Sequence, residues 1–208
     1  KLHTLGLLTS SFLPDSTTEQ LRTYCRQRTN WIELSSEASQ KMQKYLRLLN
    51  FRLDVVVNDI CGQTGIAIIE DICKGDLDAK KLAAHRHYNC RKSEEEIAKA
   101  LKGNNRQDYL FGLKQELESY RFYQRQIDAC DKQITLFLKT QINIHPEKKK
   151  LKTESKPHKR VNKNTVKNLD INQTAFQYFD GVDLMRIEGL SYSTVLTIMS
   201  ELGPDGFD

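Results

Sequence analysis

The most regular feature of this chain is an apolar stripe that recurs at alternating steps of three and four residues after Pro14. The pattern Ser16-Thr-Thr-Glu19 fits a capping box at its start, and no glycine or proline follows until Gly62. A mean period of 3.5 residues is that of a coiled coil. The stripe consists of Leu21, Tyr24, Arg28, Trp31, Ser35, Ala38, Met42, Tyr45 and Leu49. The sequence therefore predicts a helix of roughly 40 residues, about 60 Å long, whose seam is interrupted at Arg28 and Ser35.

A second stripe of the same period runs from about residue 106 to residue 143. Its positions are Leu110, Leu113, Leu117, Tyr120, Gln124, Ile127, Cys130, Ile134, Phe137 and Gln141. Two such stripes can bury each other if the helices run antiparallel. Three shorter segments between them, Thr64–Lys74, Asp78–His85 and Ser93–Lys102, are predicted to be short helices. We expect a mainly α fold in which residues 16–142 form a long antiparallel coiled-coil helical hairpin with a small helical tip.

Residues 143–170 have a different character, because they contain Pro146, Pro157 and few apolar side chains. They are predicted to be a basic, flexible linker. Nine lysines and arginines and one glutamate lie between 148 and 167, whereas the whole chain carries a net charge of +5, so the remainder is net negative. Positive charge concentrated in this way suits contacts to a DNA or RNA backbone, although a solvated tether is the alternative. The candidate binding residues are Lys148, Lys149, Lys150, Lys152, Lys156, Lys159, Arg160, Lys163 and Lys167.

The last segment, residues 171–208, has the outline of a helix-hairpin-helix. A short apolar stretch, Leu184 to Ile187, runs into a glycine turn, and a second apolar helix then ends at Gly203. In such a motif backbone N–H groups at a helix N-terminus approach a phosphate. The candidate residues are Gly189, Leu190, Ser191, Tyr192, Ser193 and Thr194. The alternative is an ordinary turn between packed helices, and in both cases Ser191 or Ser193 can cap the second helix.

Other chemistry is weakly represented. The five cysteines are dispersed without a Cys-x-x-Cys pair, which indicates reduced thiols in a cytoplasmic protein. His85, His87 and Cys90, with Cys73 further away, lack the paired doublets of a zinc site, so we predict no metal ligands. No serine is predicted to be a nucleophile, and no catalytic residue is expected. No apolar run reaches the ~18 residues of a membrane span.

Several segments, taken together in order, resemble the insertion-sequence transposases that combine RuvC-like DEDD carboxylates with a C-terminal serine nucleophile, a family that includes the bridge-RNA-guided recombinases. The matching segments are Leu21-Arg-Thr-Tyr-Cys-Arg-Gln-Arg28, Met42-Gln-Lys-Tyr-Leu46, Gly62-Gln-Thr-Gly-Ile-Ala-Ile-Ile69, Lys80-Lys-Leu-Ala83, Lys92-Ser-Glu-Glu-Glu-Ile-Ala-Lys-Ala-Leu101, Tyr109-Leu-Phe-Gly-Leu-Lys-Gln115 and the block from Gly181 to Gly203. The turn of the family is often Gly-Ile-Gly or Gly-Ile-Ser, whereas here it is Gly189-Leu190-Ser191.

The resemblance implies that this chain is an internal fragment of a DNA transposase. The metal-holding carboxylates of the family would precede Lys1, and the serine nucleophile would follow Asp208. Residues 1–15 would be the tail of an upstream RuvC-like domain, and residues 171–208 the truncated start of the C-terminal domain. The resemblance further implies DNA and a guide RNA as partners, homo-oligomers formed through residues 16–142, Mg²⁺ for the intact parent but no cofactor in this fragment, and a location at the bacterial nucleoid.

A different class of protein accounts for the same periodicity and charge. A non-catalytic coiled-coil adaptor that binds nucleic acid through its basic segment would show both features. It would not account for the order of the matching segments.

Overall fold

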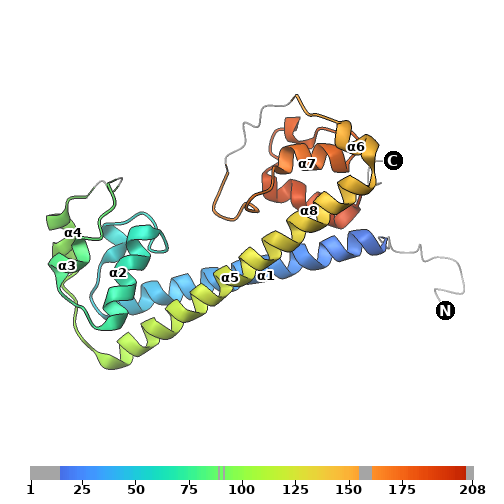
Figure 1. Cartoon of the computed structure of the whole chain (residues 1–208). Coiled ribbons are helices and arrows are strands. Elements are labelled where there is room, and N and C mark those ends of the chain that lie inside the picture. Colours follow the sequence, from blue (N-terminus) through green and yellow to red (C-terminus); the bar gives the residue numbers. More distant parts are fainter. Residues whose placement is uncertain (1–14, 89, 91, 155–160, 205–208) are drawn as a thin grey trace, which may run out of the picture. The chain divides into compact units, whose positions relative to one another are not determined.

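The computed structural model describes residues 15–88, 90, 92–154 and 161–204, and within these residues all regular structure is helical (Figure 1). The α-helices are α1 (Ser16–Leu48), α2 (Gln63–Lys74), α3 (Ala79–Ala83), α4 (Glu94–Ala100), α5 (Gln107–Ile144), α6 (Pro146–Lys150), α7 (Ile171–Tyr178) and α8 (Tyr192–Leu202). Two 3₁₀ turns accompany them, η2 (Leu53–Val55) and η3 (Leu184–Arg186). The prediction of a mainly α fold is confirmed.

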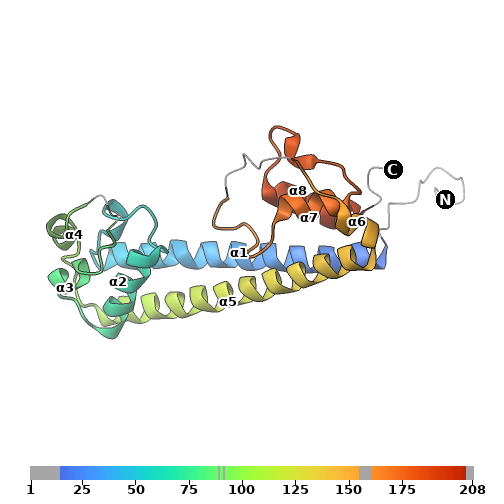
Figure 2. The same ribbon diagram turned by 45° about the horizontal axis from the view of Figure 1, so that its top comes forward.

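The two long helices, α1 and α5, pack against each other as the predicted hairpin (Figure 2). The antiparallel register is visible in two polar pairs, Arg28 with Asp131 and Ser35 with Gln124. A step of seven residues forward along α1 corresponds to a step of seven backward along α5. Each interruption of the predicted stripe therefore meets a polar partner across the seam.

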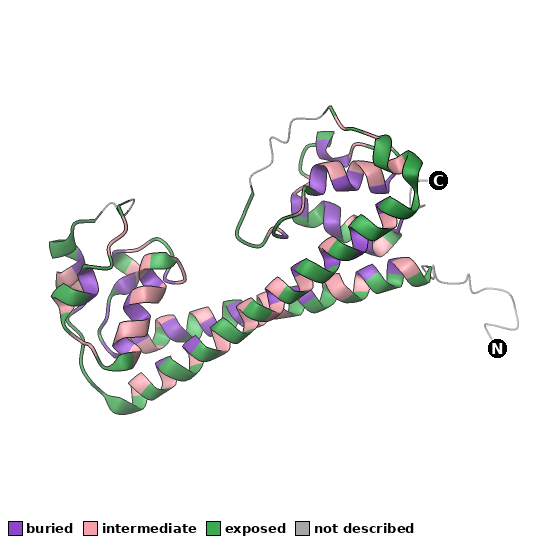
Figure 3. Cartoon of the chain, in the orientation of Figure 1, coloured by how far each residue is buried: buried purple, intermediate pink, exposed green. Residues whose placement is uncertain are grey.

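The chain divides into two compact units, each with its own core. Unit 1 comprises residues 1–29 and 128–208, and unit 2 comprises residues 30–127, so both long helices contribute to both units. Figure 3 shows buried positions gathered on the inner sides of the helices in each unit. The tail predicted over 1–15 lies outside the described residues except for Asp15.

Unit 2 has a core of aliphatic side chains from α1, α5 and the helical tip. Fully buried members include Met42, Leu46, Phe51, Ile68 and Ile97. The tip is built by local signals that the sequence shows clearly. Ser93 and Glu96 form the capping box of α4, Asp78 caps α3, and Gly75 ends α2 with a left-handed φ of 91°.

Two predicted boundaries of unit 2 are wrong. The first long helix has 33 residues rather than roughly 40, because Asn50 adopts a φ of 63° and Phe51 N–H bonds back to the Leu46 carbonyl. The apolar pattern continues beyond this point in Phe51 and Leu53, which pack in the core without extending the helix. The helix predicted over Asp78–His85 is also shorter, Ala79–Ala83.

Unit 1 buries the C-terminal half of α5 and the start of α1 against α7 and α8. Its core includes Leu21 and Leu138 from the hairpin, Val195 and Met199 from α8, and Val166 from the segment between α6 and α7. The first arm of the predicted helix-hairpin-helix is shorter than expected, because Leu184–Arg186 forms only a 3₁₀ turn capped by Asp183. The second arm is the regular helix α8.

Candidate nucleic-acid interface

The first part of the predicted basic segment is attached to α7. Gln173 and Gln177 donate side-chain hydrogen bonds to the carbonyl of Leu151, at 2.8 and 3.2 Å. The Lys148 ammonium lies 2.8 Å from the Asp180 carboxylate and 3.3 Å from the Tyr178 carbonyl. Lys148 therefore carries an internal counter-charge, which a bound phosphate would have to replace.

Lys149, Lys150 and Lys152 have exposed side chains, and their charges face solvent. Lys156, Lys159 and Arg160 lie outside the described residues, so their predicted role is neither supported nor opposed by the structure.

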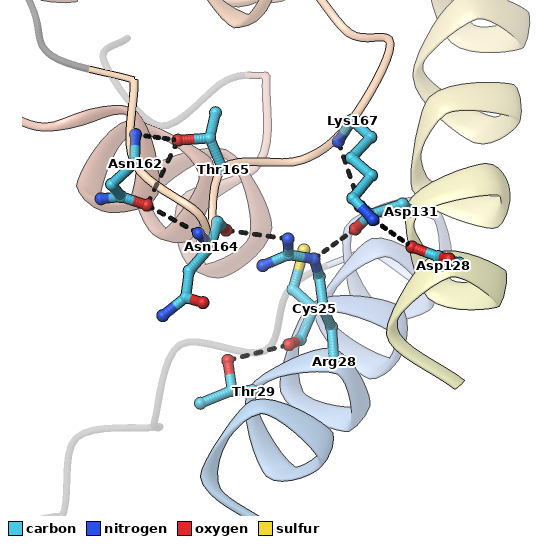
Figure 4. A network of polar contacts seen from close by, with 9 residues as sticks. All are labelled: Cys25, Arg28, Thr29, Asp128, Asp131, Asn162, Asn164, Thr165 and Lys167. Carbon is cyan, nitrogen blue, oxygen red and sulfur yellow. Dashed lines mark hydrogen bonds and ion pairs between the residues drawn. The ribbon is translucent and has the colours of Figure 1, made fainter. Parts of the chain in front are cut away.

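The second part of the basic segment is held on the hairpin by the polar network of Figure 4. Arg28 donates from Nη2 to the Asn164 carbonyl at 2.8 Å and from Nε to Asp131 at 2.5 Å. The backbone N–H of Lys167 donates to the other oxygen of Asp131 at 3.0 Å, and its ammonium bonds Asp128 at 2.7 Å. Val166 is buried between these anchors. Residues 164–167 thus have a defined position in unit 1.

This attachment places Lys167 between two hollows in the surface of unit 1. The hollow beside α5, of about 400 Å³, is lined by Asp128, Asp131, Lys132, Thr135, Leu136, Lys139, Lys167 and Asn168. The hollow beside α7, of about 790 Å³, is lined by residues 161–163 and 165–171 together with Tyr192. Lys167 and Asn168 line both, so we call these the α5 hollow and the α7 hollow.

Four lysines are brought together by these hollows. The predicted residues Lys163 and Lys167 line the α7 hollow with Tyr192, which was also predicted. Lys132 and Lys139 join Lys167 in the α5 hollow and were not predicted from the sequence. The sequence does place Lys132 and Lys139 on one exposed face of the second long helix, because they lie seven residues apart. This spacing did not mark them as binding residues, because exposed lysines are common on any helix.

The glycine turn before α8 has the backbone geometry that the sequence predicted. Gly189 has a φ of 85°, in the region that favours glycine. Ser191 is the cap of α8, and its Oγ accepts the Thr194 N–H at 3.2 Å. The same Oγ lies 2.8 Å from the hydroxyls of Ser193 and Thr194. Glu188, next to the glycine, is exposed and adds a negative charge to the turn.

Phosphate binding by the glycine turn therefore stays a prediction. The residues concerned are Gly189, Leu190, Ser191, Ser193 and Thr194. The turn is equally well satisfied as a helix cap, which is the alternative that the sequence left open. Tyr192 is the one residue of this group that lines a lysine-rich hollow.

Three further basic side chains, Arg22, Arg26 and His85, have internal partners. Arg22 and Arg26 both pair with Glu201 near the end of α8, at 3.0 Å. The imidazole Nε2 of His85 lies 2.5 Å from Asp71 Oδ2, and Lys74 pairs with the same carboxylate. Hydrogen bonds from Lys74 and then His85 hold the pKa of Asp71 below its ordinary value. In the described part of the chain, no three His, Cys, Asp or Glu side chains gather around a common point that could hold a metal ion.

Comparisons of the chain with models of known protein families, with curated proteins and with solved structures found no match. Among the described helices, none combines the length and the apolarity that a membrane crossing requires.

Proposed function

We propose that this chain binds the phosphate backbone of DNA or RNA through unit 1, as a non-catalytic part of a bacterial insertion-sequence transposase. The observation that carries the proposal is the convergence of Lys132, Lys139, Lys163 and Lys167 around two adjoining hollows. Two of these lysines come from the predicted basic segment and two from α5, the helix that precedes it in the chain. A phosphate chain that follows the two hollows would meet an ammonium group in each, and at Lys167 it would replace the Asp128 carboxylate.

The link to the transposase family rests on the sequence segments that resemble it. In that reading, DNA cleavage is the work of the carboxylates and the serine that the family carries outside these residues, together with Mg²⁺. We assign no catalytic or metal-dependent step to the present residues. Their proposed work is to hold DNA, or a guide RNA, and to bring copies of the protein together.

The proposed association of copies would use the hairpin, residues 16–142. Its support is the exposure of large apolar side chains on α5, where Phe111 and Leu136 are 67% and 62% exposed. Sedimentation should show a larger species for the wild type than for the Phe111→Lys variant, which leaves the α5 hollow unchanged, whereas Leu136 lines that hollow. A chain that sediments as a monomer at all concentrations would overturn this part of the proposal.

The binding proposal is tested by the salt dependence of affinity for a labelled oligonucleotide, measured by fluorescence anisotropy. A quadruple variant should make the negative slope of log K against log salt less steep, by up to roughly one unit per lysine in contact. Its substitutions are Lys132→Gln, Lys139→Gln, Lys163→Gln and Lys167→Gln. Substitution is preferable to deletion of the basic segment, because Val166 belongs to the core of unit 1.

A control with the same change of charge is available in unit 2. Lys41, Lys44, Lys99 and Lys102 are all exposed, and their replacement by glutamine removes four positive charges from the other unit. We expect this control to keep most of the wild-type slope. Equal slopes in the two quadruple variants would show that net charge alone matters and that the two hollows are not the site.

A further inference from the structure

The α7 hollow differs from the α5 hollow in the character of its walls. Both hollows have a mostly apolar surface, but different side chains supply it. The α7 hollow is lined by Val161, Val166, Leu169, Ile171 and Tyr192, whereas Leu136 is the one apolar residue in the lining of the α5 hollow, beside five charged residues. Binding of phosphates alone does not require such a group of apolar side chains. Val161 is 69% exposed at its edge, so the recess is open to a ligand from solvent.

Two amides stand at the edge of this recess. Asn162 uses its Oδ1 to accept from the backbone N–H of Asn164 at 2.9 Å, and Figure 4 shows its amide nitrogen directed away from that turn. Asn168 has a φ of 57°, a left-handed conformation that asparagine and glycine tolerate best. Asp170, which also lines the hollow, accepts from Gln173 N–H as the cap of α7.

We propose that the α7 hollow takes one unpaired nucleobase of the strand whose phosphates Lys132, Lys139 and Lys167 neutralise; the inference rests on the proposed function. An apolar wall gains free energy by covering the face of a base, and amide groups can bond its edge. A base within a duplex is stacked and paired, so it cannot enter. The chain therefore prefers a single strand to a duplex, and this applies to RNA and DNA alike.

The first experiment changes the ligand and leaves the protein intact. Anisotropy titrations would compare a single-stranded oligonucleotide, its duplex and an abasic strand of the same length and phosphate number. We expect the abasic strand to bind roughly tenfold more weakly or worse, in the range found for loss of base contacts. Ribose and deoxyribose versions of the single strand separate an RNA preference from a DNA preference.

The second experiment changes the recess. Asn168→Gly keeps the left-handed conformation and removes the amide, and Val161→Ala removes apolar surface at the edge. Both should weaken binding of the base-bearing strand and keep the salt slope. Val161→Ala, at a residue that lines the α7 hollow and not the α5 hollow, should also leave the abasic strand unaffected. Asn50→Gly is the matched control, because Asn50 is an exposed asparagine of unit 2 with a φ of 63°.

The outcomes separate the two proposals. If salt-dependent binding is present but abasic and base-bearing strands bind equally, the base recess is wrong and backbone binding stands. If the base-bearing strand is favoured yet Asn168→Gly and Val161→Ala behave like Asn50→Gly, the base is bound elsewhere and the inference also fails. If no oligonucleotide binds, both proposals fall.

Discussion

The guanidinium of Arg28 and the carboxylate of Asp131 form a buried ion pair across the helical hairpin, with 8% and 4% of their side chains exposed. Each partner also fixes the segment that carries Lys167, through the Asn164 carbonyl and the Lys167 N–H. Four hydrogen-bonding groups thus meet where α1, α5 and the basic segment join. The pair that interrupts the apolar seam is what positions the candidate interface.

Loss of either charge should destabilise the protein strongly. Arg28→Met leaves a buried carboxylate and Asp131→Asn a buried guanidinium, and each should cost about 3–5 kcal/mol in the free energy of unfolding. The double variant Arg28→Met, Asp131→Leu should recover most of this loss, because no unpaired charge remains. Chemical denaturation followed by circular dichroism measures all three. Single variants within 1 kcal/mol of wild type would mean that the pair is solvated.

Gly65 should not tolerate a side chain, although it lies within a helix. A Cβ added there would lie 2.2 Å from the Ile60 carbonyl oxygen and 2.6 Å from its carbon, and backbone atoms cannot move aside cheaply. Gly65→Ala is therefore expected to cost about 1–3 kcal/mol, despite the higher helix propensity of alanine. Gln63→Ala, at an exposed position of the same helix turn, is the control and should be close to neutral. A stabilised Gly65→Ala variant would contradict the close approach.

The sequence predicted the hairpin because the spacing of apolar residues is a local signal that survives in the fold. It did not identify the partners of Arg28 and Ser35, since Asp131 and Gln124 lie 103 and 89 residues away along the chain. The predicted stripe contained Gln124 but placed Cys130, not Asp131, on the seam. A shift of one residue separates these neighbours, and the spacing of apolar residues does not define the seam that closely.

The candidate interface was predicted only in part for the same reason. The basic segment stands out in composition, which is why Lys163 and Lys167 were found. Lys132 and Lys139 gain their significance from Lys167, which Asp128 and Asp131 bring to α5. Composition also does not show which ammonium groups already have a carboxylate partner, as Lys148 has in Asp180 and Lys167 has in Asp128. The pairing of charges depends on the tertiary structure, so the number of lysines in a segment does not show how many of them are free to bind a phosphate.

The glycine turn offers a test that separates its two interpretations. Ser191→Ala removes the cap of α8 and should cost about 1 kcal/mol of stability. Ser191→Asp keeps a capping oxygen and places a negative charge at the helix N-terminus, where a phosphate would lie. If the turn binds phosphate, the aspartate variant is stable but binds oligonucleotide more weakly. If Ser191→Asp binds oligonucleotide as tightly as wild type in the same anisotropy assay, the turn acts only as a helix cap and does not bind phosphate.

Cys25 provides a prediction about pH. Burial is the main cause that raises the pKa of its thiol from 9.0 to about 12. The folded protein keeps this proton while the unfolded chain loses it, so the contribution to stability is complete below pH 9 and is lost as the pH rises from 9 toward 12. Relative to Cys25→Ala, wild-type stability should fall by at most about 1.4 kcal/mol per pH unit in this range.

The measurement is a pair of urea unfolding series for wild type and Cys25→Ala at pH 8, 9 and 10. Because other groups titrate in both proteins, only the difference between the two series reports on Cys25. Native Cys25 should also react slowly with a thiol reagent at pH 8 and rapidly in urea, since the thiolate is the reactive form. Parallel stability curves, together with rapid labelling of the folded protein, would show that the Cys25 thiol is accessible to solvent.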